Sequence, residues 1–224
     1  MKIGNKMLKI QNRKMKIQLK NVIFLLLLLK ICIIFGQPPS PKKLLVIDVG
    51  HGGKDAGAIG INGIMEKDVV LQLANEILNL NKGQSNLEIY LTRYSDSLIS
   101  LTDRTKLAKA LKADIFISLH CNHAENPGTT GTEVYVANTA LSQNLRQSIY
   151  LAHQINSGIT TNFGIKSRGV KFANFQVLRE TVALCPSILV ELCFLSNWDE
   201  AEYLSDNSML KALAFSILNS LIKS

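Results

Sequence analysis

The sequence predicts that residues 44–224 form a single three-layer α/β domain, in which a mostly parallel sheet is covered by helices on both faces. The run KLLVIDVG, residues 43–50, is almost continuously apolar, as is typical of a strand that is buried on both faces. Further strand-like runs alternate with segments whose apolar residues recur about every 3.6 positions, the pattern of amphipathic helices. Strands that alternate with helices form βαβ units and therefore a mostly parallel sheet.

Six segments are predicted as strands and five as helices. The predicted strands are residues 43–50, 87–93, 114–120, 131–137, 174–178 and 187–194. The predicted helices are residues 66–82, 100–112, 142–161, 197–204 and 208–223. Ser100, Asn197 and Asp206 stand where helical patterns begin and are suited to cap them, because a short polar side chain can accept a hydrogen bond from a free backbone N–H.

The formal net charge of +8 resides in the first 36 residues. This segment contains 8 of the 25 basic residues and none of the 17 acidic ones, which leaves 17 basic against 17 acidic residues in the rest of the chain. The body therefore has no overall positive field to attract a phosphate backbone, and we expect no nucleic-acid partner.

Residues 1–36 are predicted to be a secretory signal peptide. A basic segment is followed by an apolar run of 15 residues, 22–36, which Lys30 interrupts. The run is shorter than the roughly 20 apolar residues of a spanning helix, and it ends at the small residue Gly36. An uncleaved membrane anchor is the alternative, and in both cases the body would lie outside the cytoplasm, in the periplasm or the cell envelope. Residues 37–43 form a proline-rich tether.

The loop VIDVGHGGKDAGAIG, residues 46–60, resembles a phosphate-binding loop only superficially. A P-loop that ends at Lys54 requires glycine at position 48 and serine or threonine at position 55, but the chain has Asp48 and Asp55. A dinucleotide fingerprint that starts at Gly50 also requires glycine where Asp55 stands. These mismatches argue against nucleotide binding.

Four residues suited to metal binding or proton transfer lie near the ends of predicted strands. His51 follows the first strand, His120 ends the third, Glu191 lies in the last, and Glu66 begins the first helix. In an open α/β sheet, such strand ends share one rim. Catalytic zinc sites use three protein ligands and leave a fourth position for water, so His51, Glu66 and His120 are the predicted ligands. Glu191 would then move the proton in a metal-assisted amide hydrolysis.

The loop around His51 has features that such a centre needs. Gly50, Gly52 and Gly53 would let the backbone turn sharply and approach the metal closely. Asp55 or another polar group would orient a ligand imidazole, and the sequence does not choose between them.

The chain resembles the zinc-dependent N-acetylmuramoyl-L-alanine amidases, which cut bacterial peptidoglycan. The matching blocks lie in family order over about residues 44–222: VIDVGHGGKDAGAIGINGIMEKDVVL, LTRYSD, DRTKLAKALKADIFISLHCN, GTEVYV, GVKFANFQVLRE and ILVELCFLSN. The resemblance implies one α/β domain with a central six-stranded sheet and one zinc ion on His51, Glu66 and His120. It also implies Glu191 as general base and acid, and cleavage of the amide between the lactyl group of N-acetylmuramic acid and L-alanine.

The chain departs from the family pattern at three positions. Val49 replaces a usual proline, Cys121 a small residue and Cys193 a glycine, and none of these is a ligand. Beyond the leader, the chain has three cysteines: Cys121, Cys185 and Cys193. They form no CxxC pair, so a cysteine zinc site is not expected. A disulfide between Cys121 and Cys193 and three reduced thiols are the two alternatives.

Several other polar residues stand close to the site residues in sequence. Asn122, next to His120, is a candidate substrate contact. Arg93 and Arg104 recur in the family blocks and are expected in structural ion pairs. Glu133 is expected to face solvent or to form a salt bridge.

The expected partner is peptidoglycan, and the protein is expected to be a monomer. It would contact a membrane only through the leader, if the leader is not cleaved. Some relatives carry a helical insertion that blocks the zinc until a partner protein binds. Residues 138–168 have little room for a helix beyond the predicted one, so we expect an open site that needs no protein activator. Two other functions stay open: a zinc peptidase that acts on the stem peptide, and a catalytically silent wall-binding module.

Overall fold

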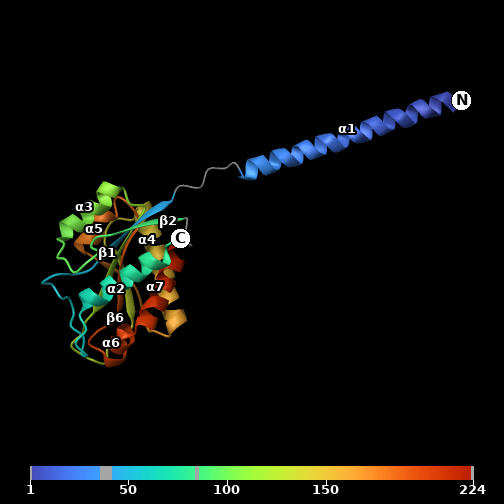
Figure 1. Ribbon diagram of the computed structural model, residues 1–224. Coiled ribbons are helices and arrows are strands. Elements are labelled where there is room, and N and C mark those ends of the chain that lie inside the picture. The colour runs from blue at the N-terminus through green and yellow to red at the C-terminus, as the bar shows by residue number, and fades with distance from the viewer. Residues whose placement is uncertain (1, 36–41, 84–85, 223–224) are drawn as a thin grey trace. The chain divides into compact units, whose positions relative to one another are not determined.

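The computed structural model describes residues 2–35, 42–83 and 86–222 (Figure 1). The chain divides into two compact units, Met1–Pro41 and Lys42–Ser224. The predicted cleavage position after Gly36 lies outside the described residues.

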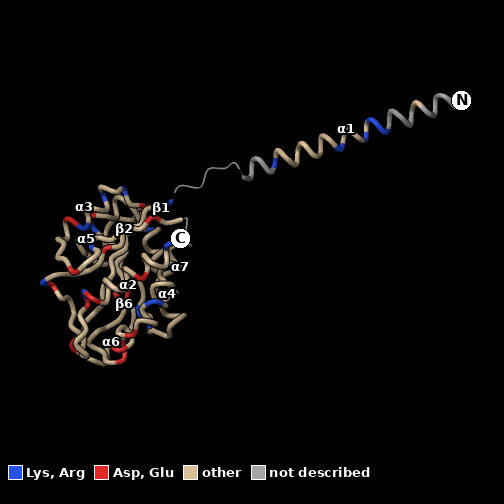
Figure 2. The backbone as a smooth tube through the Cα atoms, viewed as in Figure 1, with Lys and Arg blue, Asp and Glu red and all other residues tan. Residues whose placement is uncertain are grey.

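The first unit consists of helix α1, Lys2–Phe35. None of the helices in the described ranges is long and apolar enough to cross a membrane. In the coloured part of α1, Figure 2 marks positions of Lys and Arg and none of Asp or Glu, whereas both kinds of position are mixed along the backbone of the second unit. This distribution agrees with the charge separation read from the sequence.

The second unit contains a six-stranded sheet with the order β2-β1-β3-β6-β4-β5. The strands are β1 (Lys43–Val49), β2 (Leu87–Leu91), β3 (Ile115–Asn122), β4 (Thr132–Ala137), β5 (Ser167–Ala173) and β6 (Ser187–Phe194). β4 and β6 pair antiparallel, and all other neighbours pair parallel. The predicted α/β class with a mostly parallel six-stranded sheet is confirmed.

Helices cover both faces of this sheet (Figure 1). One face carries α2 (Glu66–Leu80), α4 (Gln143–Phe163) and α7 (Asn207–Ile222). The other face carries α3 (Leu101–Leu111) and α5 (Gln176–Thr181). The short α6 (Trp198–Ser205) contacts α7 and β6.

The apolar patterns of the sequence explain these elements. Residues 45–49 of β1 are all buried, as expected for a central strand. In α2, the buried residues Val69, Leu73 and Ile77 follow the helical period, and burial of each such side chain contributes about 1.5–3 kcal/mol. Ser100 caps α3 as predicted, by accepting a hydrogen bond from the backbone N–H of Asp103.

The prediction of a strand over residues 174–178 is wrong. The fifth strand is Ser167–Ala173, and Gln176–Thr181 forms α5. β5 is an edge strand without a fully buried residue, so it lacks the apolar run that marks the inner strands. Val177 and Leu178 are buried within a short helix, which periodicity alone cannot distinguish from a strand.

Candidate metal centre

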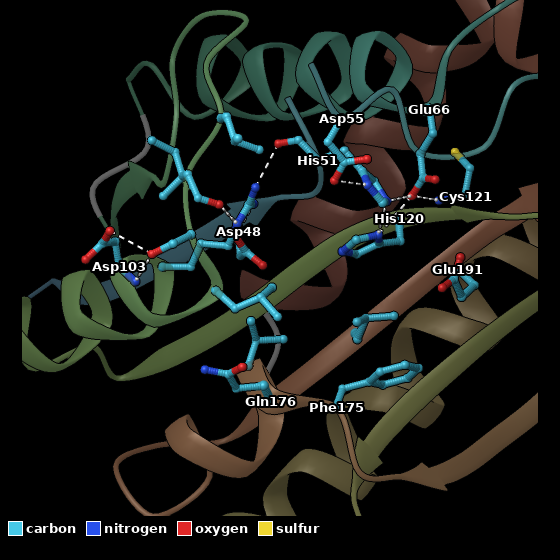
Figure 3. Close-up of a pocket in the computed structure, with 17 residues that line it drawn as sticks. Asp48, His51, Asp55, Glu66, Asp103, His120, Cys121, Phe175, Gln176 and Glu191 are labelled. Carbon is cyan, nitrogen blue, oxygen red and sulfur yellow. Dashed lines mark hydrogen bonds and ion pairs between the residues drawn. The ribbon is translucent and has the colours of Figure 1, made fainter. Parts of the chain in front are cut away.

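The three predicted ligands converge at one end of the sheet (Figure 3). His51 lies just beyond β1, Glu66 is the first residue of α2, and His120 lies in β3. Oε1 of Glu66 is 3.0 Å from Nε2 of His51 and 2.8 Å from Nδ1 of His120, and these two nitrogens are 3.2 Å apart. Tetrahedral ligands with zinc bonds of about 2.1 Å lie about 3.4 Å apart, so the three atoms are spaced closely enough to share one ion.

Two of the three candidate ligands, Glu66 and His51, are also held by groups outside the triad. Glu66 accepts backbone N–H groups from Cys121 (2.9 Å, at Oε1) and Ala58 (2.8 Å, at Oε2). Nδ1 of His51 lies 2.9 Å from Oδ2 of Asp55. Of the groups left open by the sequence, Asp55 is therefore the one that orients this imidazole, and it leaves Nε2 free to bind a metal.

The ionisation of these groups suits a cation. Burial by itself would lower the pKa of His51, but hydrogen bonds to Glu66 and Asp55 and their charges outweigh it and raise the pKa to about 9. Burial would raise the pKa of Glu66, but hydrogen bonds to His120 and His51 outweigh it and lower the pKa to about 2. The cluster therefore binds positive charge strongly, and a divalent ion can take the place of the proton on His51.

Glu191 lies beside this triad. It is the register partner of His120 on the neighbouring parallel strand, so both side chains project from the same face of the sheet. Burial, the largest cause, raises the pKa of Glu191 to about 7. Among the described residues, its Oε2 is buried and has no hydrogen-bond partner. Glu191 lines a cavity of about 830 Å³ together with His51, Glu66 and His120. Figure 3 shows these four side chains around it.

The comparisons with known proteins agree with this geometry. The family Amidase_3, described as N-acetylmuramoyl-L-alanine amidase, matches residues 45–223. The chain belongs to this family. It is 39% identical over 174 residues to the endolysin of Bacillus phage SPP1, which is 77% of this chain and 62% of that protein. It is 36% identical over 166 residues to the N-acetylmuramoyl-L-alanine amidase LytC of Bacillus subtilis strain 168, which is 74% of this chain and 32% of that protein.

Solved structures of amidases have the same fold. The catalytic domain of the amidase CwlV from Bacillus (Paenibacillus) polymyxa var. colistinus is 34% identical, with a TM-score of 0.74, over 81% of this chain and 97% of that one. The chain thus covers nearly all of a solved amidase catalytic domain, but 62% and 32% of the length of the two curated relatives.

Glycines make room for the candidate ligands of this centre. A Cβ atom on Gly50 would lie 2.5 Å from Cε1 of His120. Gly57 has a φ of +67°, and a Cβ there would lie 2.4 Å from Oε2 of Glu66. The predicted role of Gly50 in close approach agrees with this packing, whereas a Cβ on Gly52 would instead meet the carbonyl oxygen of Ser97.

Two buried arginines hold the backbone that carries His51. Arg104 donates to the carbonyl oxygen of His51 (2.7 Å) and forms an ion pair with Asp48 (2.8 Å). Arg93 donates to the carbonyl oxygens of Gly50 (2.8 Å) and Val49 (3.1 Å). The expected ion pair is confirmed for Arg104, but Arg93 binds carbonyl oxygens instead. Sequence reasoning missed this positioning role, because carbonyl acceptors leave no trace in the residue pattern.

Glu133 forms the predicted salt bridge. Its carboxylate is buried and pairs with Arg168 and with Lys171 (2.7 Å) from β5. Tyr135 and Asn122 donate to its other oxygen at 2.5 Å and 3.3 Å. Asn122, the candidate substrate contact, thus donates to Glu133, and it is not among the residues that line the cavity.

Of the two alternatives for the cysteines, the structure has three reduced thiols. Cys121, Cys185 and Cys193 are all buried, free thiols. Burial raises the pKa of the Cys121 and Cys193 thiols well above the usual value. Adjacency to site residues at one rim does not provide the matched Cβ directions that a disulfide requires.

We predict that Gly57→Ala lowers zinc affinity by about tenfold or more, because its methyl group displaces Glu66 and the ring of His51. Competition with a chromogenic chelator measures this affinity. Gly63→Ala is the matched control, since Gly63 also has positive φ (+86°) but nothing within 4 Å of a Cβ. Equal losses of affinity in both variants would mean that backbone strain alone is responsible.

Arg104→Lys should retain the positive charge beside Asp48. It should lose the planar guanidinium group, which donates to Asp48 and to the carbonyl oxygen of His51 at the same time. We expect zinc affinity to fall about 10- to 100-fold, as for other groups that support metal ligands. Arg146→Lys, at an exposed position of α4, is the control. Unchanged zinc affinity in folded Arg104→Lys would contradict the positioning role.

Stability should depend on pH through Glu133. Burial alone raises the pKa of this carboxyl, but hydrogen bonds from Lys171, Tyr135 and Arg168 outweigh it and lower the pKa. A lowered native pKa contributes stability above the unfolded value of about 4.3, and this contribution is lost as pH falls through the native pKa.

Glu133→Gln should therefore be less stable than the wild type by about 1–3 kcal/mol at pH 7. The difference should shrink towards pH 3, because below the unfolded pKa the unfolded chain takes up a proton on this carboxyl before the native chain does. Urea unfolding at both pH values tests this, with the exposed Glu125→Gln as control. The idea fails if the difference is the same at both pH values.

Proposed function

We propose that the chain is a zinc-dependent N-acetylmuramoyl-L-alanine amidase that hydrolyses peptidoglycan. The bond cleaved is the amide between the lactyl group of N-acetylmuramic acid and L-alanine. The observation that carries this proposal is the His51, Glu66 and His120 triad beside Glu191, a buried carboxylate with one oxygen free of protein partners. Membership in the amidase family supports the choice of substrate.

In this proposal, His51, Glu66 and His120 hold one zinc ion. When bound, zinc polarises a carbonyl group and lowers the pKa of a water molecule to about 7. Glu191 accepts the proton of the attacking water and returns it to the departing amine of L-alanine. One C–N bond breaks, one C–O bond forms, and the carboxylate is regenerated.

The environment of Glu191 suits both proton transfers. A pKa near 7 lets a side chain accept and release a proton at neutral pH. A cation at the triad would favour the ionised form and lower this pKa, while burial and the nearby carboxylates of Glu66 and Glu133 raise it.

The substrate places the proposed action outside the cytoplasm. We infer that residues 1–36 act as the export signal or as a membrane anchor, which directs the domain to the periplasm or cell envelope. One helix, α4, connects β4 to β5, which supports an open site that needs no activator. Asn122 remains a proposed contact to the substrate.

Glu191→Gln should reduce hydrolysis of purified muropeptides at least about 10²-fold, because the amide cannot accept the proton. The variant should still bind one zinc ion per chain. Mass spectrometry of the products identifies the bond: lactyl-muramyl sugar with intact stem peptides indicates an amidase, and shortened stems indicate a peptidase.

The exposed Glu202→Gln is the control and should be fully active. Wild-type activity in Glu191→Gln would refute the assigned role. No products from the zinc-loaded wild type would instead favour the wall-binding module.

A further inference from the structure

An ion pair joins the loop that follows His51 to the first turn of α2. The backbone N–H of Gly53 donates to Oδ1 of Asp96 (2.7 Å). The amine of Lys67 donates to the other oxygen of Asp96, Oδ2 (2.7 Å), and to the carbonyl oxygen of Gly53 (3.0 Å). These three hydrogen bonds close on themselves, so the Lys67–Asp96 pair satisfies both backbone groups of Gly53.

The pair lies next to two of the candidate metal ligands along the chain. Gly53 is two residues after His51, and Lys67 directly follows Glu66. Asp96 comes from a third place, the segment between β2 and α3. Oε1 of Glu66 and Nε2 of His51 are 3.0 Å apart, so any shift of the loop relative to the helix changes the spacing of these two ligand atoms.

A tight turn connects Gly53 to the side chain that orients His51. Gly52 and Asp55 exchange two backbone hydrogen bonds, of 2.9 Å and 3.2 Å, and Gly53 lies within the turn that they close. Oδ2 of Asp55 lies 2.9 Å from Nδ1 of His51 (Figure 3). By holding Gly53, the Lys67–Asp96 pair therefore holds the turn from which Asp55 reaches this imidazole.

Two glycines let the segment that carries Asp96 approach the loop. A Cβ atom on Gly52 would lie 2.1 Å from the carbonyl oxygen of Ser97, and one on Gly53 would lie 3.0 Å from the backbone nitrogen of Leu98. Both glycines have positive φ, +126° and +58°, which other residues rarely adopt. The contact between Asp96 and Gly53 thus depends on close packing of two backbones.

The Lys67 amine is suited to this role because it is largely buried. Its side chain is 13% exposed, against 46% for Asp96, and a buried ammonium group needs acceptors. Arg93 also contributes positive charge near Asp96. Arg93 makes a second link between the same segments, since Nη2 donates to the carbonyl oxygens of Gly50 (2.8 Å) and Lys67 (2.7 Å). Loss of the Lys67–Asp96 pair should therefore weaken metal binding without abolishing it.

We propose that Lys67 and Asp96 are positioning residues that set the spacing of His51 and Glu66 for a divalent metal ion. This inference rests on the proposed function, which requires zinc at the triad. Neither residue is among those that line the catalytic cavity, so the pair acts through the backbone of the turn and of α2. Ligands that are already correctly spaced lose less freedom when the ion binds, which raises affinity.

The test measures zinc affinity of the full chain by competition with a chromogenic chelator. Lys67→Met removes the amine, and Asp96→Asn removes the charge that pairs with it. Each variant should bind zinc about tenfold more weakly than the wild type. The double variant should lose about as much as one single variant, because either substitution already opens the closed set of hydrogen bonds.

Two exposed residues of the same region provide matched controls. Asp68→Asn removes a negative charge one residue from Lys67, and Lys82→Met removes an amine just beyond the end of α2. Both should bind zinc like the wild type. An equal loss of affinity in Asp68→Asn would show that net charge near the site, and not position, is responsible, and would overturn the inference.

Thermal unfolding of the zinc-free chains separates positioning from stability. A lower melting temperature with unchanged zinc affinity in Lys67→Met and Asp96→Asn would overturn the inference, as would losses of affinity that add in the double variant. Either result would leave the proposed function intact, provided that the wild type binds zinc and cleaves muropeptides. A wild type that binds no zinc would overturn the proposed function as well.

Discussion

The buried ion pair between Arg104 and Asp48 fixes the position from which the rest of the site is built. Asp48 also accepts hydrogen bonds from Thr92 (3.0 Å) and Ser118 (2.7 Å), so its carboxylate joins β1, β3, α3 and the segment after β2. A buried charge pair is stable only when its remaining hydrogen-bonding capacity is satisfied, and these contacts satisfy it. Nη2 of Arg104 then donates to the carbonyl oxygen of His51. The backbone of His51 has a φ of +55°, which residues other than glycine rarely adopt.

The reversed direction of β4 explains why one rim carries so much charge. Parallel strands bring only their carboxyl ends to this rim, and there β3 and β6 present His120 and Glu191. β4 runs the other way, so its second residue, Glu133, reaches the same level as Glu191. β5 is parallel to β4, and its residues Arg168 and Lys171 pair with Glu133 at the same place. The antiparallel pairing thus adds an ionic cluster to a catalytic rim.

The sequence predicted the parts of the site that depend on residue type and strand ends. His51, Glu66 and His120 could be predicted to meet, because each stands at the end of a strand or the start of a helix that the apolar pattern reveals. The fifth strand was misplaced because β5 lies at the edge of the sheet and lacks a continuous buried run. The role of Arg93 depends on which carbonyl oxygens a loop turns inward, and residue identities do not encode that directly. The convergence on Glu133 depends on a register shift, which becomes visible only when the strands are paired.

The buried negative charges of Glu66 and Glu133 are neutralised in different ways, Glu66 within the His51, Glu66 and His120 triad and Glu133 by Arg168 and Lys171. Around Glu66, the balancing positive charge is a proton on a histidine, which a metal ion can replace, so the site stays exchangeable. Around Glu133, the balancing charges are covalent parts of the chain and cannot leave. Glu191 lies between them on the sheet, with one oxygen free of protein partners. A fixed cationic cluster on one side and an exchangeable cation on the other give this carboxylate an environment in which a proton can be accepted and released while the surrounding charges stay in place.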